Sequence, residues 1–83
     1  MSKQIKLQYQ NNIKRAILPK TYEDLLNSIS SSFNLDSRYV VITYKDDEGD
    51  LLKVSNQFDL DQATIFYEKE GLKTLKFTLE IDQ

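Results

Sequence analysis

The sequence predicts an α+β fold in which one mixed sheet of five strands packs against two helices, in the order ββαββαβ. Apolar and polar residues alternate near both ends of the chain, through Ile5, Leu7 and Tyr9 and again through residues 75–81. This is the period of strands with one buried face. Residues 22–33 carry an apolar stripe at helical spacing, which a sheet could cover.

The first strand is expected to fold back in a hairpin. Residues 10–12 (Gln-Asn-Asn) supply the turn, and residues 13–18 form the return strand, which Pro19 ends. The facing of this return strand is ambiguous, because its two isoleucines favour one face while Ala16 and Leu18 favour the other. A β-bulge would reconcile the two patterns.

A helix is expected to follow. Thr21 with Asp24 three residues later resembles a capping box, and Asn34 is predicted to end the helix in the left-handed conformation that asparagine accepts. The apolar residues at helical spacing between them are Tyr22, Leu25, Leu26, Ile29 and Phe33.

A second hairpin, a second helix and a last strand complete the prediction. Residues 39–44 indicate a largely buried strand, residues 46–50 a turn, and residues 51–54 the return strand. Asp59 is a fair N-cap for a helix that runs to about Glu70. The residues at core spacing in this helix are Leu60, Ala63 and Tyr67, and Gly71 is its expected stop. In the final strand, Leu75, Phe77, Leu79 and Ile81 alternate with polar residues.

Size and composition limit the function. The 83 residues predict a single domain, 1–83, and 40% hydrophobic with 29% charged residues is typical of a folded one. The net charge of -2 argues against a general nucleic-acid binder, which would carry a basic excess, and cysteine and histidine are absent. No apolar run is long enough to span a membrane. We therefore expect a soluble, cytoplasmic domain without a cofactor.

Charge is strongly segregated along the chain. Residues 1–20 carry bases and no acid, whereas residues 46–61 carry six acids against Lys53 alone. Clustered negative charges repel one another and raise the energy of the isolated fold, so a cationic partner surface is the simplest explanation for the acids. The alternative is a solvated turn whose acids only aid solubility. The bases are Lys3, Lys6, Lys14, Arg15 and Lys20, and the acids are Asp46, Asp47, Glu48, Asp50, Asp59 and Asp61.

Catalytic and metal-binding interpretations of the acidic segment fail. Asp46 and Asp50 as acid and base of a hydrolase would need a cleft that separates their pKa values, which a hairpin tip does not offer. In an EF-hand loop starting at Asp46, Gly49 would stand at position four and Gln57 at position twelve, which is the wrong register. We therefore expect no enzyme, no catalytic residue and no metal site.

The acidic segment resembles a known family motif. The pattern Tyr44-Lys45-Asp46-x-Glu48-Gly49-Asp50-Leu51-x-x-Val54-Ser55-x-x-x-Asp59-Leu60-x-x-Ala63 closely resembles the acidic OPCA motif of the Phox and Bem domain family, often called PB-one domains. The resemblance covers essentially the whole chain and implies the ubiquitin-like β-grasp fold. It implies an acidic interaction face made of Asp46, Glu48, Asp50, Asp59 and Asp61.

The same resemblance assigns a role to the basic end. In this family a lysine in the first strand and a basic cluster in the second form the surface that receives another domain's acidic motif; Lys6, Lys14 and Arg15 stand at those places. Which of Lys14 and Arg15 makes the second contact is left open by the ambiguous strand. One departure is that Gln57 and Phe58 precede Asp59, so we expect that half of the acidic surface to be weaker.

A chain with both faces resembles the mixed type of the family. This implies a protein-interaction module that binds itself head to tail, as a ring or a filament, or pairs with another PB-one domain, and so scaffolds a larger signalling, trafficking or autophagy-type protein. The alternative is a ubiquitin-like domain that binds a small GTPase or a ubiquitin-recognising protein through its sheet. A processed modifier is disfavoured, because residues 80–83 lack a diglycine tail.

Overall fold

The computed structural model describes residues 3–82 and has the predicted order ββαββαβ. Its strands are β1 (Gln4–Tyr9), β2 (Asn12–Ile17), β3 (Val40–Lys45), β4 (Leu51–Lys53) and β5 (Thr74–Ile81). Its helices are α1 (Tyr22–Phe33) and α2 (Gln57–Lys69), and a single 3₁₀ turn, η1 (Ser37–Tyr39), precedes β3. The prediction of an α+β fold with a mixed sheet is confirmed.

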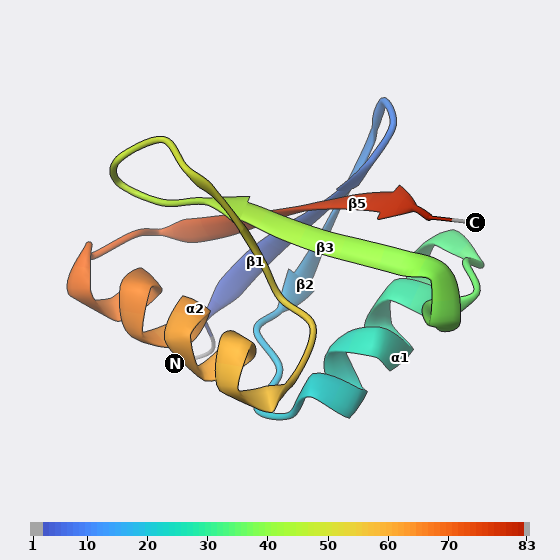
Figure 1. Ribbon diagram of the computed structural model, residues 1–83, viewed down its shortest axis with the longest axis horizontal. Helices are drawn as coiled ribbons and strands as arrows, with labels where there is room; N and C mark the ends of the chain where they lie inside the picture. The colour runs from blue at the N-terminus through green and yellow to red at the C-terminus, as the bar shows by residue number, and fades with distance from the viewer. Residues whose placement is uncertain (1–2, 83) are drawn as a thin grey trace.

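The five strands form one sheet in the order β2-β1-β5-β3-β4. The central strands β1 and β5 run parallel, and the other neighbours are antiparallel. Both helices lie on the same face of the sheet, below it in Figure 1. The opposite face of the sheet is therefore open, and β2 and β4 are its two edges.

The core lies between the sheet and the two helices. Alternate residues of β1 and β5 enter it as predicted, and Phe77 is completely buried. The hydroxyl of the buried Tyr67 donates to the Lys73 carbonyl at 2.8 Å and accepts from the Gln4 N–H at 3.3 Å, which joins the loop before β5 to the start of β1. The buried core residues are Ile5, Leu7, Leu25, Ile29, Ile42, Tyr44, Val54, Leu60, Ala63, Tyr67, Leu75, Phe77 and Leu79.

The first hairpin is regular, so the bulge considered for its return strand is absent. Asn12 already belongs to β2 and pairs with Tyr9, which leaves a turn of Gln10 and Asn11, with Gln10 at φ 55°. Ala16 lies opposite Ile5 and packs against the core. Ile13 and Ile17 lie instead on the open face of β2, where no helix covers them, and they remain exposed.

Helix α1 begins and ends as predicted. The Thr21 hydroxyl accepts a hydrogen bond from the Asp24 N–H at 3.1 Å, which satisfies one of the free amides of the first turn. At the other end Asn34 has φ 56° and donates its N–H to the Ser30 carbonyl at 2.8 Å. Leu25 and Ile29 are buried on its inner face.

Helix α2 begins earlier than predicted. Its N-cap is Asn56, whose side chain accepts from the Asp59 N–H at 2.8 Å, so the assignment of Asp59 as N-cap is wrong. Asp59 instead occupies the first turn and accepts from the Ser55 N–H and hydroxyl, both at 3.0 Å. Asparagine caps a helix as well as aspartate does. The negative charge of an acid in the first turn is stabilised by the positive end of the helix dipole. Gly71, at φ 62°, follows the helix as expected.

Candidate interaction surfaces

The acidic turn between β3 and β4 is closed by one of its own carboxylates. Asp46 Oδ1 accepts from the N–H groups of Glu48 at 3.0 Å and Asp50 at 2.9 Å, and the Asp46 N–H donates to the Asp50 carbonyl at 2.9 Å. Gly49 takes φ 85°, which suits glycine in a tight turn. Because Asp46 holds the loop, the side chains of Glu48 and Asp50 are left exposed to solvent.

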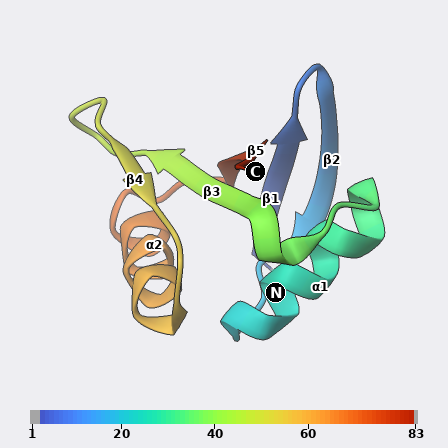
Figure 2. The same cartoon turned by 45° about the vertical axis from the view of Figure 1, so that its right-hand side comes forward.

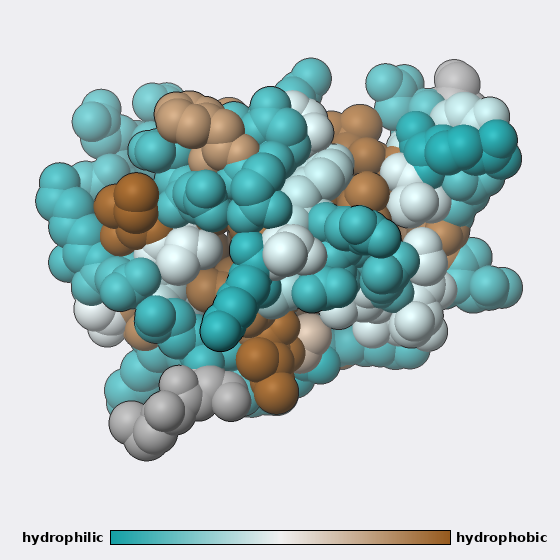
Figure 3. Space-filling model, turned by 90° about the horizontal axis from the view of Figure 1, so that it is seen from below, coloured by the Kyte–Doolittle hydropathy of each residue, from teal (hydrophilic) through white to brown (hydrophobic). Residues whose placement is uncertain are grey.

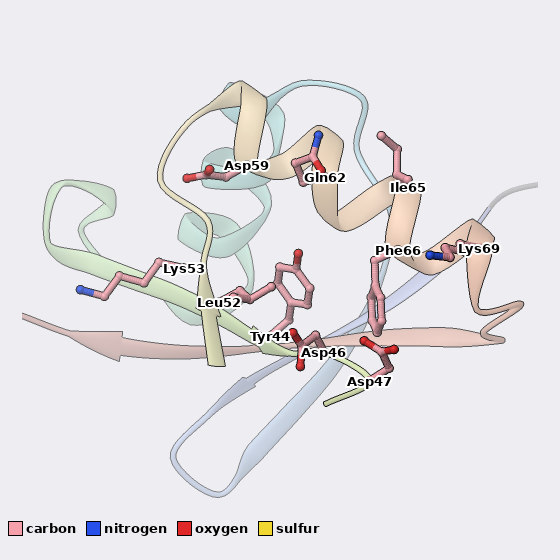
Figure 4. Close-up of a pocket in the computed structure, with 10 residues that line it drawn as sticks. All are labelled: Tyr44, Asp46, Asp47, Leu52, Lys53, Asp59, Gln62, Ile65, Phe66 and Lys69. Carbon is pink, nitrogen blue, oxygen red and sulfur yellow. The ribbon is translucent and has the colours of Figure 1, made fainter. Parts of the chain in front are cut away.

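A cleft separates this hairpin from α2, and two acids act on the phenol at its floor. Figure 4 shows Tyr44 between the hairpin carboxylates and the helix that carries Asp59. Burial raises the pKa of Tyr44, and the negative charges of Asp46 and Asp59 raise it further. Because Asp46 and Asp59 both line this cleft, they belong to the same surface.

We call Asp46, Glu48, Asp50 and Asp59 the acidic face. In the described part of the chain, residues 3–82, the two ion pairs are Lys3 with Glu68 and Arg38 with Asp36. Neither involves a residue of the acidic face, although Lys53 borders the cleft. Within residues 3–82, therefore, no ion pair neutralises the negative charge of this face.

Asp61 lies apart from the acidic face. Its Oδ1 accepts from the Gln57 side-chain amide at 3.0 Å, and it borders a separate hollow together with Lys20. Gln57 also accepts from the Tyr22 N–H at 2.7 Å and donates to the Lys20 carbonyl at 3.0 Å. Gln57 stands where the family motif favours an acid, and its hydrogen bonds connect the start of α2 to the start of α1.

Three cations form a row across the open face of the sheet. Lys6 on β1 lies opposite Arg15 on β2 and opposite Lys76 on β5, and partners in a ladder project to the same side. We call Arg15, Lys6 and Lys76 the basic row. Sequence reasoning did not find Lys76, because only the parallel pairing of β1 with β5 brings it beside Lys6; its alternation in a strand was the one available signal.

Lys14 has a different environment from Arg15. It lies opposite Leu7, on the helix side of the sheet, and its Nζ donates to the Ser32 carbonyl near the end of α1. The ammonium is also 5.2 Å from the centroid of the Phe33 ring. Lys14 therefore stabilises the packing of α1 on β2, whereas Arg15 shares the open face with Lys6.

The two charged surfaces lie at opposite ends of the sheet. The basic row spans β2, β1 and β5, and the acidic turn joins β3 to β4, the next two strands in the order. Figure 2 shows the two hairpins projecting on separate sides. The helix-covered side seen in Figure 3 is mostly hydrophilic, with small separate apolar areas.

Comparison with known proteins identifies the family. A model of the PB1 domain matches residues 2–81. The chain belongs to the PB1 domain family. The sequence-based assignment to this family is confirmed, and so is the ubiquitin-like α+β fold. No curated protein matches the chain.

Solved PB1 structures have the same fold. The AtNBR1-PB1 domain superposes with a TM-score of 0.76 at 20% identity, covering 96% of this chain and 97% of that one. The same domain in an L-type filament, solved by cryo-electron microscopy, gives 0.71 at 23% identity with 98% of both chains covered. The PB1 domain of Cdc24p, long form, in solution gives 0.73 at 23% identity, covering 95% and 96%.

Membership of the family sets the general function. PB1 domains are protein-interaction modules rather than enzymes, and this PB1 domain is such a module. Across residues 3–82, none of its helices has the length and apolar character needed to cross a membrane.

Proposed function

We propose that this PB1 domain associates front to back, with the acidic face of one copy bound to the basic row of the next copy or of another PB1 domain. The observation that carries the proposal is the pair of unneutralised charged surfaces at opposite ends of one sheet. Among residues 3–82 no ion pair joins the two surfaces, so each is available to a second molecule.

Several charge pairs must act together in such a contact. A single exposed ion pair contributes about 0–1 kcal/mol, which is too little to hold two domains together. The basic row offers three cations, and strands about 4.8 Å apart space them over roughly 10 Å. A complementary group of carboxylates also accelerates encounter and gives an affinity that falls as salt is added.

The contact is heterologous, because each copy contributes different surfaces to its two neighbours. Such contacts propagate as an open filament unless the rotation between copies closes a ring. The filament formed by the AtNBR1-PB1 domain, which shares this fold, supports an assembly of this kind. In a longer protein, the assembly would act as a scaffold that concentrates the attached segments.

The environment of each residue ranks its expected contribution. Arg15 is proposed as the second basic contact in place of Lys14, because Lys14 is engaged at the end of α1. Asp61 is proposed as a minor contributor, because Gln57 holds its carboxylate away from the cleft. Asp59 remains in the acidic face even though it also accepts from Ser55, since a carboxylate has further acceptor positions.

Light scattering as a function of salt tests the proposal. Lys6→Ala removes the centre of the basic row, and Glu48→Gln with Asp50→Asn removes charge from the acidic face while Asp46 still closes the turn. Each variant should be monomeric under conditions where the wild type forms oligomers, and an equal mixture of the two should form a 1:1 dimer. Lys73→Ala and Glu23→Gln, at exposed positions outside both surfaces, are matched controls and should assemble normally.

Two results would contradict the proposal. One is a wild-type domain that stays monomeric at high concentration and low salt and binds no other PB1 domain. The other is a Glu48→Gln, Asp50→Asn variant that assembles like the wild type, as expected of a ubiquitin-like domain that uses its sheet alone.

A further inference from the structure

The outer edge of β2 has backbone groups that are free to pair. The Leu18 N–H donates to the Lys3 carbonyl at 2.8 Å, which fixes the alternation of hydrogen bonds between β1 and β2. In an antiparallel ladder, alternate residues bond to the partner and those between direct their N–H and C=O groups away from it. Ile13, Arg15 and Ile17 are the residues between, so their backbone groups line the open edge.

The side chains at this edge are also unusual for an unpaired strand. Ile13 is 54% exposed and Ile17 is 58% exposed, and Arg15 lies between them on the same open face. Proteins commonly protect edges with short strands, proline or charged side chains, and Arg15 is the charge at this edge. β4, the other edge, has three residues, whereas β2 has six and no proline. β2 is therefore the edge with room for another strand.

We propose that β2 accepts an extended, acidic segment of another protein as a sixth, antiparallel strand. The segment carries one carboxylate opposite Arg15 and an apolar residue two positions away on each side, opposite Ile13 and Ile17. Residues directly opposite in an antiparallel pair are in contact, so the ion pair and two apolar pairs would set the register. Backbone hydrogen bonds would supply the sequence-independent part of the affinity.

Charge favours this occupant over a second copy of the same edge. The register that pairs all three residues of two β2 edges places Arg15 opposite Arg15, and like charges directly opposite destabilise a ladder. The nearby Lys6 and Lys14 increase the positive potential around the site. An acidic segment relieves this repulsion, whereas a second β2 adds to it.

The proposed strand uses Arg15, which front-to-back association also uses. A bound acidic segment would therefore block the basic row and end a chain of domains at that copy. The binding itself needs no self-association, so it can be measured on a domain whose acidic face has been neutralised.

The experiment uses the Glu48→Gln, Asp50→Asn domain and the capped peptide Ser-Thr-Val-Thr-Glu-Thr-Val-Thr-Ser, observed by NMR. The amides of Ile13, Arg15 and Ile17 should shift and become protected from hydrogen exchange on binding. N-methylation of the glutamate or either valine should weaken binding about tenfold, because it removes a hydrogen bond to β2. N-methylation of the threonine on either side of the glutamate should have little effect, because that N–H faces away from β2.

Charge reversal supplies the second readout. Arg15→Glu should abolish binding of the glutamate peptide and create binding of the same peptide with lysine at its centre. Absence of binding by the glutamate peptide overturns the proposal. Binding that is insensitive to the position of N-methylation also overturns it, because that outcome indicates electrostatic attraction to the basic row without strand pairing. Neither result would bear on front-to-back association, which light scattering measures separately.

Discussion

Asp46 has two separable roles, and paired substitutions should distinguish them. Its Oδ1 accepts from two backbone N–H groups at 3.0 and 2.9 Å, and its charge belongs to the acidic face. Asp46→Ala removes both hydrogen bonds and the charge. At about 1 kcal/mol for each hydrogen bond, it should lower the free energy of unfolding by about 2 kcal/mol, or about 8–16 °C in Tm for a domain of this size.

Asp46→Asn should behave differently, because the amide oxygen can still accept both hydrogen bonds. We expect a loss of about 0.5–1 kcal/mol, since neutral acceptors are weaker than charged ones. Both variants lose the negative charge, so both should weaken self-association to a similar extent. Stability would then separate the variants while association would not.

Urea unfolding followed by circular dichroism measures the stability difference. About 1 M NaCl should keep the domain monomeric if the proposed association holds, because the Debye length there is about 3 Å. An alanine variant within about 0.5 kcal/mol of the wild type would show that these hydrogen bonds do not hold the turn. An asparagine variant that associates like the wild type would show that the Asp46 charge is not used.

Three further predictions concern the scaffold that positions these surfaces. Gln57→Ala removes the hydrogen bonds that join α2 to the start of α1 and should cost about 1–2 kcal/mol in urea unfolding, whereas Gln62→Ala, on the exposed side of α2, should be nearly neutral. Phe77→Ala should cost about 3–5 kcal/mol or abolish cooperative unfolding, because the ring is completely buried. Hydrogen bonds from the Arg38 side chain and backbone lower the pKa of Asp36 to about 2. The stability that this contributes should be present above pH 3.8 and should fade as the pH falls toward 2. In Arg38→Gln, NMR titration of the carboxyl group should show a higher pKa for Asp36.

Local patterns in the sequence were sufficient for most of the fold. The alternation in β1 and β5 and the apolar stripe of α1 are short-range periodicities, and each places its own residues on a buried face without reference to distant segments. The cap at Thr21 and the left-handed Asn34 are equally local. The segregation of acids from bases along the chain, and the family motif around the acidic turn, also needed no coordinates.

Tertiary structure decided which charged residues share a surface. Whether Lys14 or Arg15 faces outward depended on the register of β2, an edge strand whose apolar residues fit either face. Lys76 joins Lys6 only because a parallel pairing brings together strands from opposite ends of the chain. Asp61 lies apart from the acidic face, beside Gln57 and Lys20, because residues two apart on a helix point to different sides. A one-dimensional pattern specifies the charge that a segment carries, but a surface is a set of neighbours in space, and long-range strand pairing determines those neighbours.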